Sequence, residues 1–421
     1  MRVLLLGGGG REHALAWALA RGGTVDTVVT APGNPGIAEV GPVVSSSITD
    51  ADAVARTAVE AGVDLVVVGP EAPLAAGVAD ALRNKGVPTF GPGRAAARME
   101  ASKTFAKEIM AAAGVPTAQA TAYHDPAAAL ADLDGREPPF VIKADGLAAG
   151  KGVLVTAERS EARAWVDRCF DGGFGDAGST VVIEDFLDGP ELSVFALCAG
   201  GDAVAFGAAR DHKRLRDGDE GPNTGGMGCF SPVPEVDDGA VDDVLDRIVR
   251  PVLGALVDRG IDYRGFLYAG LAITHDGPSV VEFNVRMGDP EAQVIMPLLV
   301  SDPAPLFAAV ADGALPPEPI EWRPGAAVDV VLAAAGYPEG PRRGDRISGV
   351  DGLADRDDVV VFHAGTARDD AGGLVTAGGR VLNVVGLGEG LAEARTAAYE
   401  AVDRIHFDGM QVRRDIAGVG R

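Results

Sequence analysis

Three polar residues that alternate with apolar ones, Glu282, Asn284 and Arg286, have the types needed to bind a metal ion and an anion. Successive side chains of a β-strand point to opposite faces, so these three share one face of a strand. Carboxylate and amide oxygens suit a hard cation such as Mg²⁺, which is commonly bound with the help of substrate phosphates. Arginine can hold a carboxylate or phosphate with two parallel hydrogen bonds. A solvated polar face is the alternative, but the segment 287–291 that follows lacks an ordinary turn composition.

A glycine-rich segment, residues 143–152, resembles a P-loop at first sight. The P-loop pattern requires glycine at 145 and serine or threonine at 152, where this chain has Asp145 and Gly152. Residues 153–155 also predict a strand, whereas a P-loop continues into a helix. We therefore expect a hairpin whose backbone amides close over phosphates, with Lys143 and Lys151 adding charge. The whole chain has only six lysines, so two in this segment favour a function over a plain flexible hairpin.

The glycine run Gly7–Gly10 lies between a predicted strand and a predicted helix, a position where backbone N–H groups attract anions. It is a poor dinucleotide fingerprint, because Glu12 stands where the third glycine belongs. The acidic residue expected at the end of the second strand is also missing; residues 31–34, Ala-Pro-Gly-Asn, stand there. A smaller phosphate ligand fits better than NAD, and a nicotinamide oxidoreductase is disfavoured. A tight turn without a ligand is the alternative.

Two further segments are weak signals by themselves. The predicted strand 180–186, with Glu184 and Asp185 near its end, can present backbone donors and acceptors to an adenine edge, and Glu191 can accept hydrogen bonds from ribose hydroxyls. An ordinary strand and turn is the simpler interpretation. The polar segment 211–228 mixes charges with glycines and is expected to be a long loop, either a substrate lid or a solvated loop. The histidines show no nucleophile or metal spacing, so packing or surface roles are expected for them.

The first hundred residues alternate strands with helices, which predicts a doubly wound parallel sheet. The predicted strands are residues 2–6, 25–30 and 64–68, and a helix covers 11–20. Ligands bind outside the carboxyl ends of such strands. Glycine and proline cluster at those ends, including Gly69 and Pro70 before Glu71.

Beyond residue 100 strands follow one another directly, which predicts an α+β arrangement. A helix is expected over 102–113 with Ser102 as its N-cap. Expected strands are 140–143, 153–156, 180–186, 191–199, 203–209, and the antiparallel pair 266–274 and 279–285. The proline-rich stretch 315–319 indicates a linker. Strands near 326–334, 359–364 and 380–385 and a helix over 390–405 complete the chain. We divide it into domains 1–101, 102–315 and 316–421, and find no catalytic constellation in the last.

Composition limits the class of protein. The chain has 421 residues, of which 47 % are hydrophobic, enough for more than one buried core. No apolar run is long enough to span a membrane and no secretory signal begins the chain. A formal net charge of −24 disfavours nucleic-acid binding. The three cysteines lack metal-ligand spacing, so a reducing cytoplasm is the expected location.

As an ordered set, the motifs resemble the phosphoribosylamine–glycine ligase family of the ATP-grasp superfamily, over nearly the whole chain. The segments that carry the resemblance are 8–14, 31–34, 68–74, 142–153, 211–228 and 282–291. It implies an N-terminal substrate-binding α/β domain, a central ATP-grasp domain and a small C-terminal α+β domain. It also implies ATP-dependent ligation of glycine to 5-phosphoribosylamine through glycyl phosphate, a step of purine biosynthesis.

The resemblance implies roles for individual residues. ATP would be bound by Lys103, Lys143, Gly146, Gly150, Lys151, Gly152, Glu184, Phe186, Leu187 and Glu191. Mg²⁺ or Mn²⁺ would be bound by Glu282 and Asn284. The other substrates would contact Gly9, Gly10, Glu12, Asn34, Gly69, Pro70, Glu71, Asp211 and Arg286. Arg286, Asp211 and Lys151 would take part in catalysis. A monomer, or at most a weak dimer, without nucleic-acid or membrane partners is expected.

Two other functions stay open on the residues alone. Another ATP-grasp carboxylate–amine ligase would use a different acid or amine; the segment 211–228 and the N-terminal glycine run argue against it by resemblance. A non-catalytic nucleotide-binding regulator is disfavoured because a mere binder needs no metal-and-arginine face such as that of Glu282, Asn284 and Arg286.

Overall fold

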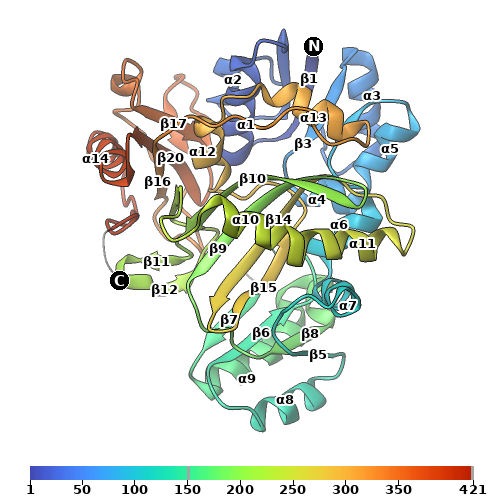
Figure 1. Cartoon of the computed structure of the whole chain (residues 1–421). Helices are drawn as coiled ribbons and strands as arrows, with labels where there is room; N and C mark the ends of the chain where they lie inside the picture. Colours follow the sequence, from blue (N-terminus) through green and yellow to red (C-terminus); the bar gives the residue numbers. More distant parts are fainter. Residues whose placement is uncertain (149–151, 419–421) are drawn as a thin grey trace.

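The computed structural model describes residues 1–148 and 152–418, and its N-terminal region is a four-stranded parallel sheet (Figure 1). The strand order is β2-β1-β3-β4, with every neighbouring pair parallel. These strands are β1 (Arg2–Gly7), β2 (Thr27–Pro32), β3 (Leu65–Val68) and β4 (Thr89–Phe90). The helices of this region are α1 (Gly10–Arg21), α2 (Ile37–Val40), α3 (Ala51–Ala61), α4 (Glu71–Ala76), α5 (Val78–Asn84) and α6 (Arg94–Ala101). The predicted doubly wound parallel sheet is confirmed.

The next region is a small antiparallel sheet that lies at the bottom of Figure 1. Its order is β5-β8-β6-β7, and the β6–β7 pair is the predicted glycine-rich hairpin. The strands are β5 (Ala120–Tyr123), β6 (Phe140–Ala144), β7 (Val153–Thr156) and β8 (Val181–Glu184), with helices α8 (Pro126–Asp134) and α9 (Arg159–Arg168). Helix α7 (Lys103–Ala113) precedes this sheet. The Ser102 hydroxyl accepts the N–H of Phe105, so the predicted N-cap is confirmed.

An eight-stranded sheet of order β15-β14-β9-β10-β13-β16-β20-β17 joins the rest of the chain. The first five strands are β15 (Gly277–Asn284), β14 (Arg264–Thr274), β9 (Glu191–Ala199), β10 (Asp202–Asp211) and β13 (Gly228–Ser231). The other three are β16 (Ala326–Ala333), β20 (Arg380–Gly388) and β17 (Val359–His363). Strand β13 pairs with both β10 and β16. The strands that follow the predicted linker 315–319 in the sequence therefore extend the central sheet.

The prediction of a long loop over 211–228 is wrong. The segment contains a hairpin, β11 (Arg214–Arg216) and β12 (Glu220–Asn223), between the end of β10 and the start of β13. Its residues have poor β-propensity, so the sequence pattern does not reveal the strands. They are held by contacts with the C-terminal region, where Arg413 donates hydrogen bonds to Asp219 and to the Arg214 carbonyl.

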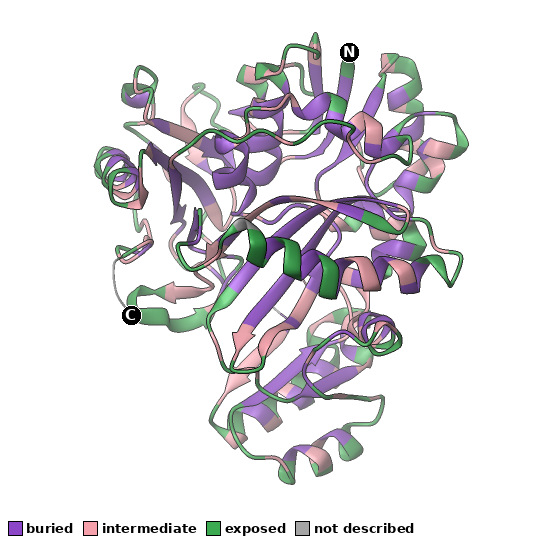
Figure 2. Cartoon of the chain, in the orientation of Figure 1, coloured by how far each residue is buried: buried purple, intermediate pink, exposed green. Residues whose placement is uncertain are grey.

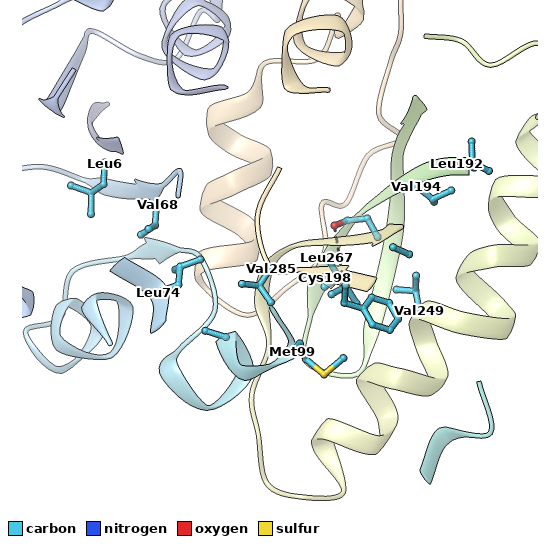
Figure 3. Close-up of a cluster of buried hydrophobic side chains, with 14 of the residues drawn as sticks. Leu6, Val68, Leu74, Met99, Leu192, Val194, Cys198, Val249, Leu267 and Val285 are labelled. Atoms are coloured by element: carbon cyan, nitrogen blue, oxygen red, sulfur yellow. Dashed lines mark hydrogen bonds between the residues drawn. The ribbon is translucent and has the colours of Figure 1, made fainter. Parts of the chain in front are cut away.

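A buried apolar cluster connects the N-terminal and central regions (Figure 3), and much of the central sheet is coloured as buried in Figure 2. It runs from the N-terminal sheet through Met99 of α6 and Val285 to strands β9 and β14 and helix α11 (Arg250–Val257). The remaining α-helices are α10 (Asp238–Val244), α12 (Ala292–Ile295), α13 (Pro303–Ala311) and α14 (Leu391–Val402), and β18 (Thr366–Arg368) pairs with β19 (Leu374–Thr376). No helix in the described parts of the chain is long and apolar enough to cross a membrane.

Candidate active site

A cavity of about 470 Å³ opens where the small antiparallel sheet faces strands β14 and β15. Most of the predicted site residues line it: Glu71, Lys103, Lys143, Gly146, Gly152, Glu184, Phe186, Leu187, Glu191, Asp211, Glu282, Asn284 and Arg286. Gly150 and Lys151 lie outside the described residues. The tertiary structure thus gathers residues that are spread over more than two hundred positions of the chain.

Two lysines of the cavity are held near the glycine-rich hairpin by hydrogen bonds to backbone carbonyl groups. Lys103, at the start of α7, donates from Nζ to the Gly146 carbonyl oxygen at 3.1 Å. Lys143, on β6, donates from Nζ to the Val281 carbonyl oxygen at 3.1 Å. Burial lowers the pKa of Lys103, and the charge of Lys143 lowers it further, while nearby Glu282 opposes this. Two cations at the base of a glycine-rich hairpin are suited to neutralising phosphates.

The carboxylate of Glu184 forms ion pairs with two lysines. It is buried at the end of β8 and pairs with Lys143, and with Lys107 Nζ at 2.8 Å. Lys107 also donates to the Ala118 carbonyl oxygen at 2.8 Å. The side chain of Glu184 therefore orients Lys143, which is predicted to bind phosphate. Contact with an adenine edge, as predicted for this strand end, would fall to the backbone and to Phe186 and Leu187.

Glu282 and Asn284 supply two oxygen donors on the cavity side of β15. Within the described residues, the Glu282 carboxylate has no hydrogen-bond or ion-pair partner. Burial raises its pKa, but the charges of Lys213, Lys143 and Lys103 outweigh that effect and leave it lowered. An ionised carboxylate beside an amide oxygen fits Mg²⁺ or Mn²⁺, which would receive its other ligands from phosphates and water.

Arg286 follows β15 and contacts two carboxylates from the N-terminal region. Its Nη2 donates to Glu100 Oε1 at 2.7 Å, and its Nε reaches Glu71 Oε2 at 3.4 Å. Nη2 also donates to Asn284 Oδ1 at 3.1 Å. Burial lowers the pKa of the guanidinium, but the two glutamates outweigh burial and hold it above its usual value. Arg286 is therefore a permanent cation in the cavity wall.

Negative charge gathers around Asp211. Burial raises the pKa of Asp211 to about 7; Lys213 opposes this, and the carboxylates of Glu291, Glu191 and Glu282 add to it. Glu291 is buried and accepts a hydrogen bond from the Ser193 hydroxyl at 3.1 Å. Such a carboxylate-rich corner is suited to an ammonium group.

The N-terminal glycine loop is stabilised by its own side chains. Glu12 Oε2 accepts the Gly9 N–H at 2.7 Å, and its Oε1 pairs with Arg11 at 2.6 Å. Asn34 uses both amide hydrogens, donating to the Gly8 carbonyl oxygen at 3.0 Å and to the His363 carbonyl oxygen at 2.8 Å. Gly9, Gly10, Glu12, Asn34, Gly69 and Pro70 do not line the described cavity. Their contacts with a substrate remain predictions.

Comparison with known families accounts for most of the chain. Profiles of phosphoribosylglycinamide synthetase match residues 1–100 as its N domain, 101–292 as its ATP-grasp (A) domain and 327–419 as its C domain. The chain belongs to the phosphoribosylglycinamide synthetase family. The three-domain architecture expected from the sequence is therefore confirmed.

Relatives in this family cover the whole chain. The phosphoribosylamine–glycine ligase of Caulobacter vibrioides is 51 % identical over 99 % of this chain and 97 % of its own length. That of Streptomyces coelicolor is 49 % identical over 99 % of both. A crystal structure of the Thermotoga maritima phosphoribosylamine–glycine ligase is 38 % identical, with a TM-score of 0.84 over 99 % of this chain and 100 % of that one. A biotin carboxylase of Campylobacter jejuni, at 14 % identity, has a TM-score of 0.72 over 99 % of this chain and 94 % of that one, and shares the fold alone.

Several cavity residues of this synthetase-family chain escaped sequence reasoning. Arg380 belongs to the C domain, where we found no catalytic constellation, yet it lines the cavity. It donates to the carbonyl oxygens of Gly225 and Asp289, both at 2.6 Å. Glu100 and Lys107 lie on ordinary-looking helices and carry no local signal. Glu291 lies within the segment 282–291 that carried the family resemblance, so its place in the site could have been expected.

Proposed function

We propose that the chain ligates glycine to 5-phosphoribosylamine with ATP, giving glycinamide ribonucleotide, ADP and phosphate, a step of purine biosynthesis. Its relatives at about half identity over their full length are named phosphoribosylamine–glycine ligases. The observation that carries the proposal is the charge layout of one cavity: lysines at the glycine-rich hairpin, oxygen donors on β15, Arg286 beside them and carboxylates around Asp211.

The reaction divides into two steps. A glycine carboxylate oxygen attacks the γ-phosphorus of ATP, the bond to the β-phosphate oxygen breaks, and ADP leaves glycyl phosphate behind. The neutral amine of phosphoribosylamine then attacks the acyl carbon, phosphate leaves and the nitrogen loses a proton. Phosphorylation is needed because a free carboxylate has no leaving group. Phosphoryl transfer depends mainly on positioning and charge neutralisation, which matches a site without a protein nucleophile.

The residues of the cavity take the following proposed roles. Lys103 and Lys143 neutralise ATP phosphates, and the hairpin after Lys143 covers them and excludes water from the acyl phosphate. Glu282 and Asn284 bind Mg²⁺ or Mn²⁺, which supplies further charge neutralisation when bound. Arg286 binds the glycine carboxylate, and Asp211 the glycine ammonium.

The deciding experiment measures ADP release by the purified chain with ATP, Mg²⁺, glycine and freshly prepared 5-phosphoribosylamine. ADP should form only when both co-substrates are present, together with one equivalent of glycinamide ribonucleotide identified by mass. Alanine, serine and β-alanine in place of glycine test the acid, and ammonia tests the amine. Faster ADP release with another acid or amine would replace this function with that of a different ATP-grasp ligase, and nucleotide binding without turnover would favour a regulator.

We also propose a cytoplasmic, monomeric enzyme. All three cysteines are free and buried, as expected of a protein in a reducing compartment. Light scattering of the purified chain at several concentrations tests the oligomeric state; a constant dimer mass would overturn the monomer.

A further inference from the structure

Arg286 is shared unequally between two carboxylates of the N-terminal region. The Glu100 contact is short, 2.7 Å from Nη2 to Oε1, whereas the Glu71 contact is long, 3.4 Å from Nε to Oε2. The Glu100 side chain is only 8 % exposed, while that of Glu71 is 25 % exposed. Because charge-assisted hydrogen bonds weaken with length and solvent access, Glu100 is the firm partner and Glu71 the loose one.

Glu100 holds the backbone of the site as well as the guanidinium. Its second oxygen, Oε2, accepts the Val285 N–H at 2.9 Å. One carboxylate therefore spans two consecutive residues, the main chain of Val285 and the side chain of Arg286. Both carboxylate oxygens of Glu100 therefore have a hydrogen-bond partner.

Apolar packing places both ends of this bridge. Met99 precedes Glu100 and Val285 precedes Arg286, and both belong to the buried cluster that joins the N-terminal and central regions. Figure 3 shows Met99 and Val285 lying between the N-terminal side chains Leu6, Val68 and Leu74 and those of β9 and β14. Because the interior is close-packed, the position of Glu100 is determined by these packing contacts and not by solvent.

Among the paired N–H groups of Arg286, the Nε–H is the one with the weakest partner. Nη2 donates to Glu100 and Asn284, and Nη1 donates to the Met287 carbonyl oxygen at 3.2 Å. The Nε–H has only the long contact with Glu71. A carboxylate that accepted the Nε–H would replace Glu71 and leave the Glu100 hydrogen bond to Nη2 in place.

We propose that Glu100 is a positioning residue for the ligation and that Glu71 is an exchangeable partner, which the substrate carboxylate replaces on Arg286. The inference rests on the proposed function for the identity of that carboxylate, glycine. Glu100 acts through Arg286, since it presents the guanidinium at a set distance from the metal-binding Asn284. Glu71 keeps the guanidinium paired until the carboxylate binds.

The first test compares Glu100→Gln with Glu108→Gln, an exposed glutamate of α7 as the matched control. Glu100→Gln should lower kcat/KM for glycine roughly 10- to 100-fold, the range expected when a reacting group is misplaced by about 1 Å. KM for ATP should stay within about twofold, because the lysines at the hairpin are unchanged. Glu108→Gln should behave as wild type. Equal losses of kcat/KM for glycine and for ATP, in proportion to a lower unfolding temperature, would show that Glu100 has only a structural role.

A double-mutant cycle tests whether Glu100 acts through Arg286. If it does, adding Glu100→Gln to the Arg286→Lys variant should lower kcat/KM for glycine by less than about threefold. The Arg286→Lys substitution has by then already broken the contact between Glu100 and the guanidinium. Additive losses would overturn the positioning role. Hydrogen exchange supplies a readout without turnover: the Val285 amide should exchange faster in Glu100→Gln than in wild type, and unchanged protection would contradict the bridge.

Glu71→Gln tests the exchange. Because Glu71 is also predicted to contact phosphoribosylamine, this variant is tested for glycine binding in the absence of that amine. Its dissociation constant for glycine should stay within about threefold of wild type, because the lost contact is one that glycine displaces anyway. An increase as large as that of Glu100→Gln would reject the exchange. If the wild-type enzyme uses another acid, the proposed function fails, and the same variants assayed with that acid still decide the roles of Glu100 and Glu71.

Discussion

Asp211 illustrates how neighbouring charges determine what a residue can do. With its pKa near 7, it is about half ionised at neutral pH, whereas an aspartate in water is fully ionised. Two buried histidines and the half-buried His212 offer the opposite case: desolvation lowers the pKa of His13 to about 3 and those of His212 and His363 to about 4. These histidines therefore do not titrate near neutral pH, and Asp211 does.

The pH dependence of glycine binding follows from this pKa. In the role proposed for Asp211, its ionised form binds the glycine ammonium more tightly than its protonated form does, so the apparent KM for glycine should fall as pH rises from about 6 to about 8. The inflection should lie near 7. Steady-state kinetics at saturating ATP across this range measure it.

Asp211→Asn is the control for that prediction. It should remove the inflection and raise KM for glycine at all pH values. Folding raises the pKa of Asp211 above the unfolded value of about 4, so its contribution to stability is present below that pH and lost as pH rises towards 7. The asparagine variant should therefore unfold at a higher temperature than wild type at pH about 8. An unchanged inflection near 7 would assign the titration to another group.

Removal of the Glu282 carboxylate should weaken metal use. Glu282→Gln keeps the size of the side chain but loses the charge, and the Mg²⁺ concentration needed for half-maximal ADP formation should rise at least about tenfold. Titration of activity with Mg²⁺ at fixed ATP measures this. Wild-type turnover and an unchanged Mg²⁺ midpoint would reject Glu282 as a metal ligand.

Helix α7 and the glycine-rich hairpin are joined by one carboxylate. Asp145, just after β6, accepts the backbone N–H groups of Lys103 and Thr104 and the Thr104 hydroxyl. A carboxylate at a helix N-terminus satisfies otherwise unpaired N–H groups and interacts favourably with the helix dipole. The element that carries Lys103 is thereby held against the strand that carries Lys143.

Asp145→Ala should lower the free energy of unfolding by about 1–2 kcal/mol, as loss of a helix cap does, and should also raise KM for ATP several-fold. Asp125→Ala is the matched control: Asp125 Oδ2 accepts the Ala128 N–H at 2.8 Å at the start of α8, away from the cavity. It should cost similar stability and leave KM for ATP unchanged. Denaturant unfolding and initial rates distinguish the two variants, and equal KM values would disprove the link between α7 and the hairpin.

Across the whole molecule, the C-terminal region reaches into the site through the β11–β12 hairpin. Arg413 is fully buried, donates to Asp219 at 2.7 Å and forms two hydrogen bonds to Asp415 at 2.7 and 2.6 Å. Asp415 in turn accepts the Gly218 N–H at 2.8 Å. The hairpin lies between Lys213 and Gly225, which both line the cavity, so these bonds connect the C-terminal region with the cavity wall.

Arg413→Ala should therefore reduce stability by about 3 kcal/mol, since it leaves buried polar groups unpaired, and should raise KM for glycine. Arg342→Ala is the matched control, because Arg342 pairs with Asp345 at 2.7 Å and with the Asp408 carbonyl oxygen without leaving the C-terminal region. Thermal unfolding and glycine titration separate the two. A KM for glycine that is unchanged in Arg413→Ala would show that the hairpin needs no support from this region.

Sequence patterns were sufficient to predict structure where the pattern lies within one short segment. The alternation of strands and helices predicted the parallel N-terminal sheet, and the apolar residues after Gly152 distinguished a hairpin from a P-loop. The same reasoning missed the β11–β12 strands, because their pairing depends on Arg413, about two hundred residues away. It also did not show that both amide hydrogens of Asn34 are used within the chain; the contact of this residue with a substrate stays a prediction.

The sequence by itself determined the order of elements, the glycine-rich loops and the residue types of the site, because hydrophobic period, turn residues and motif spacing are properties of neighbouring residues. Only the tertiary structure decided which charges pair. Glu100 and Arg286 are 186 positions apart, and the eight-stranded sheet brings Arg380 to a cavity otherwise lined by the earlier regions. Such pairs depend on how separate elements pack, and packing is set by the buried cluster as a whole.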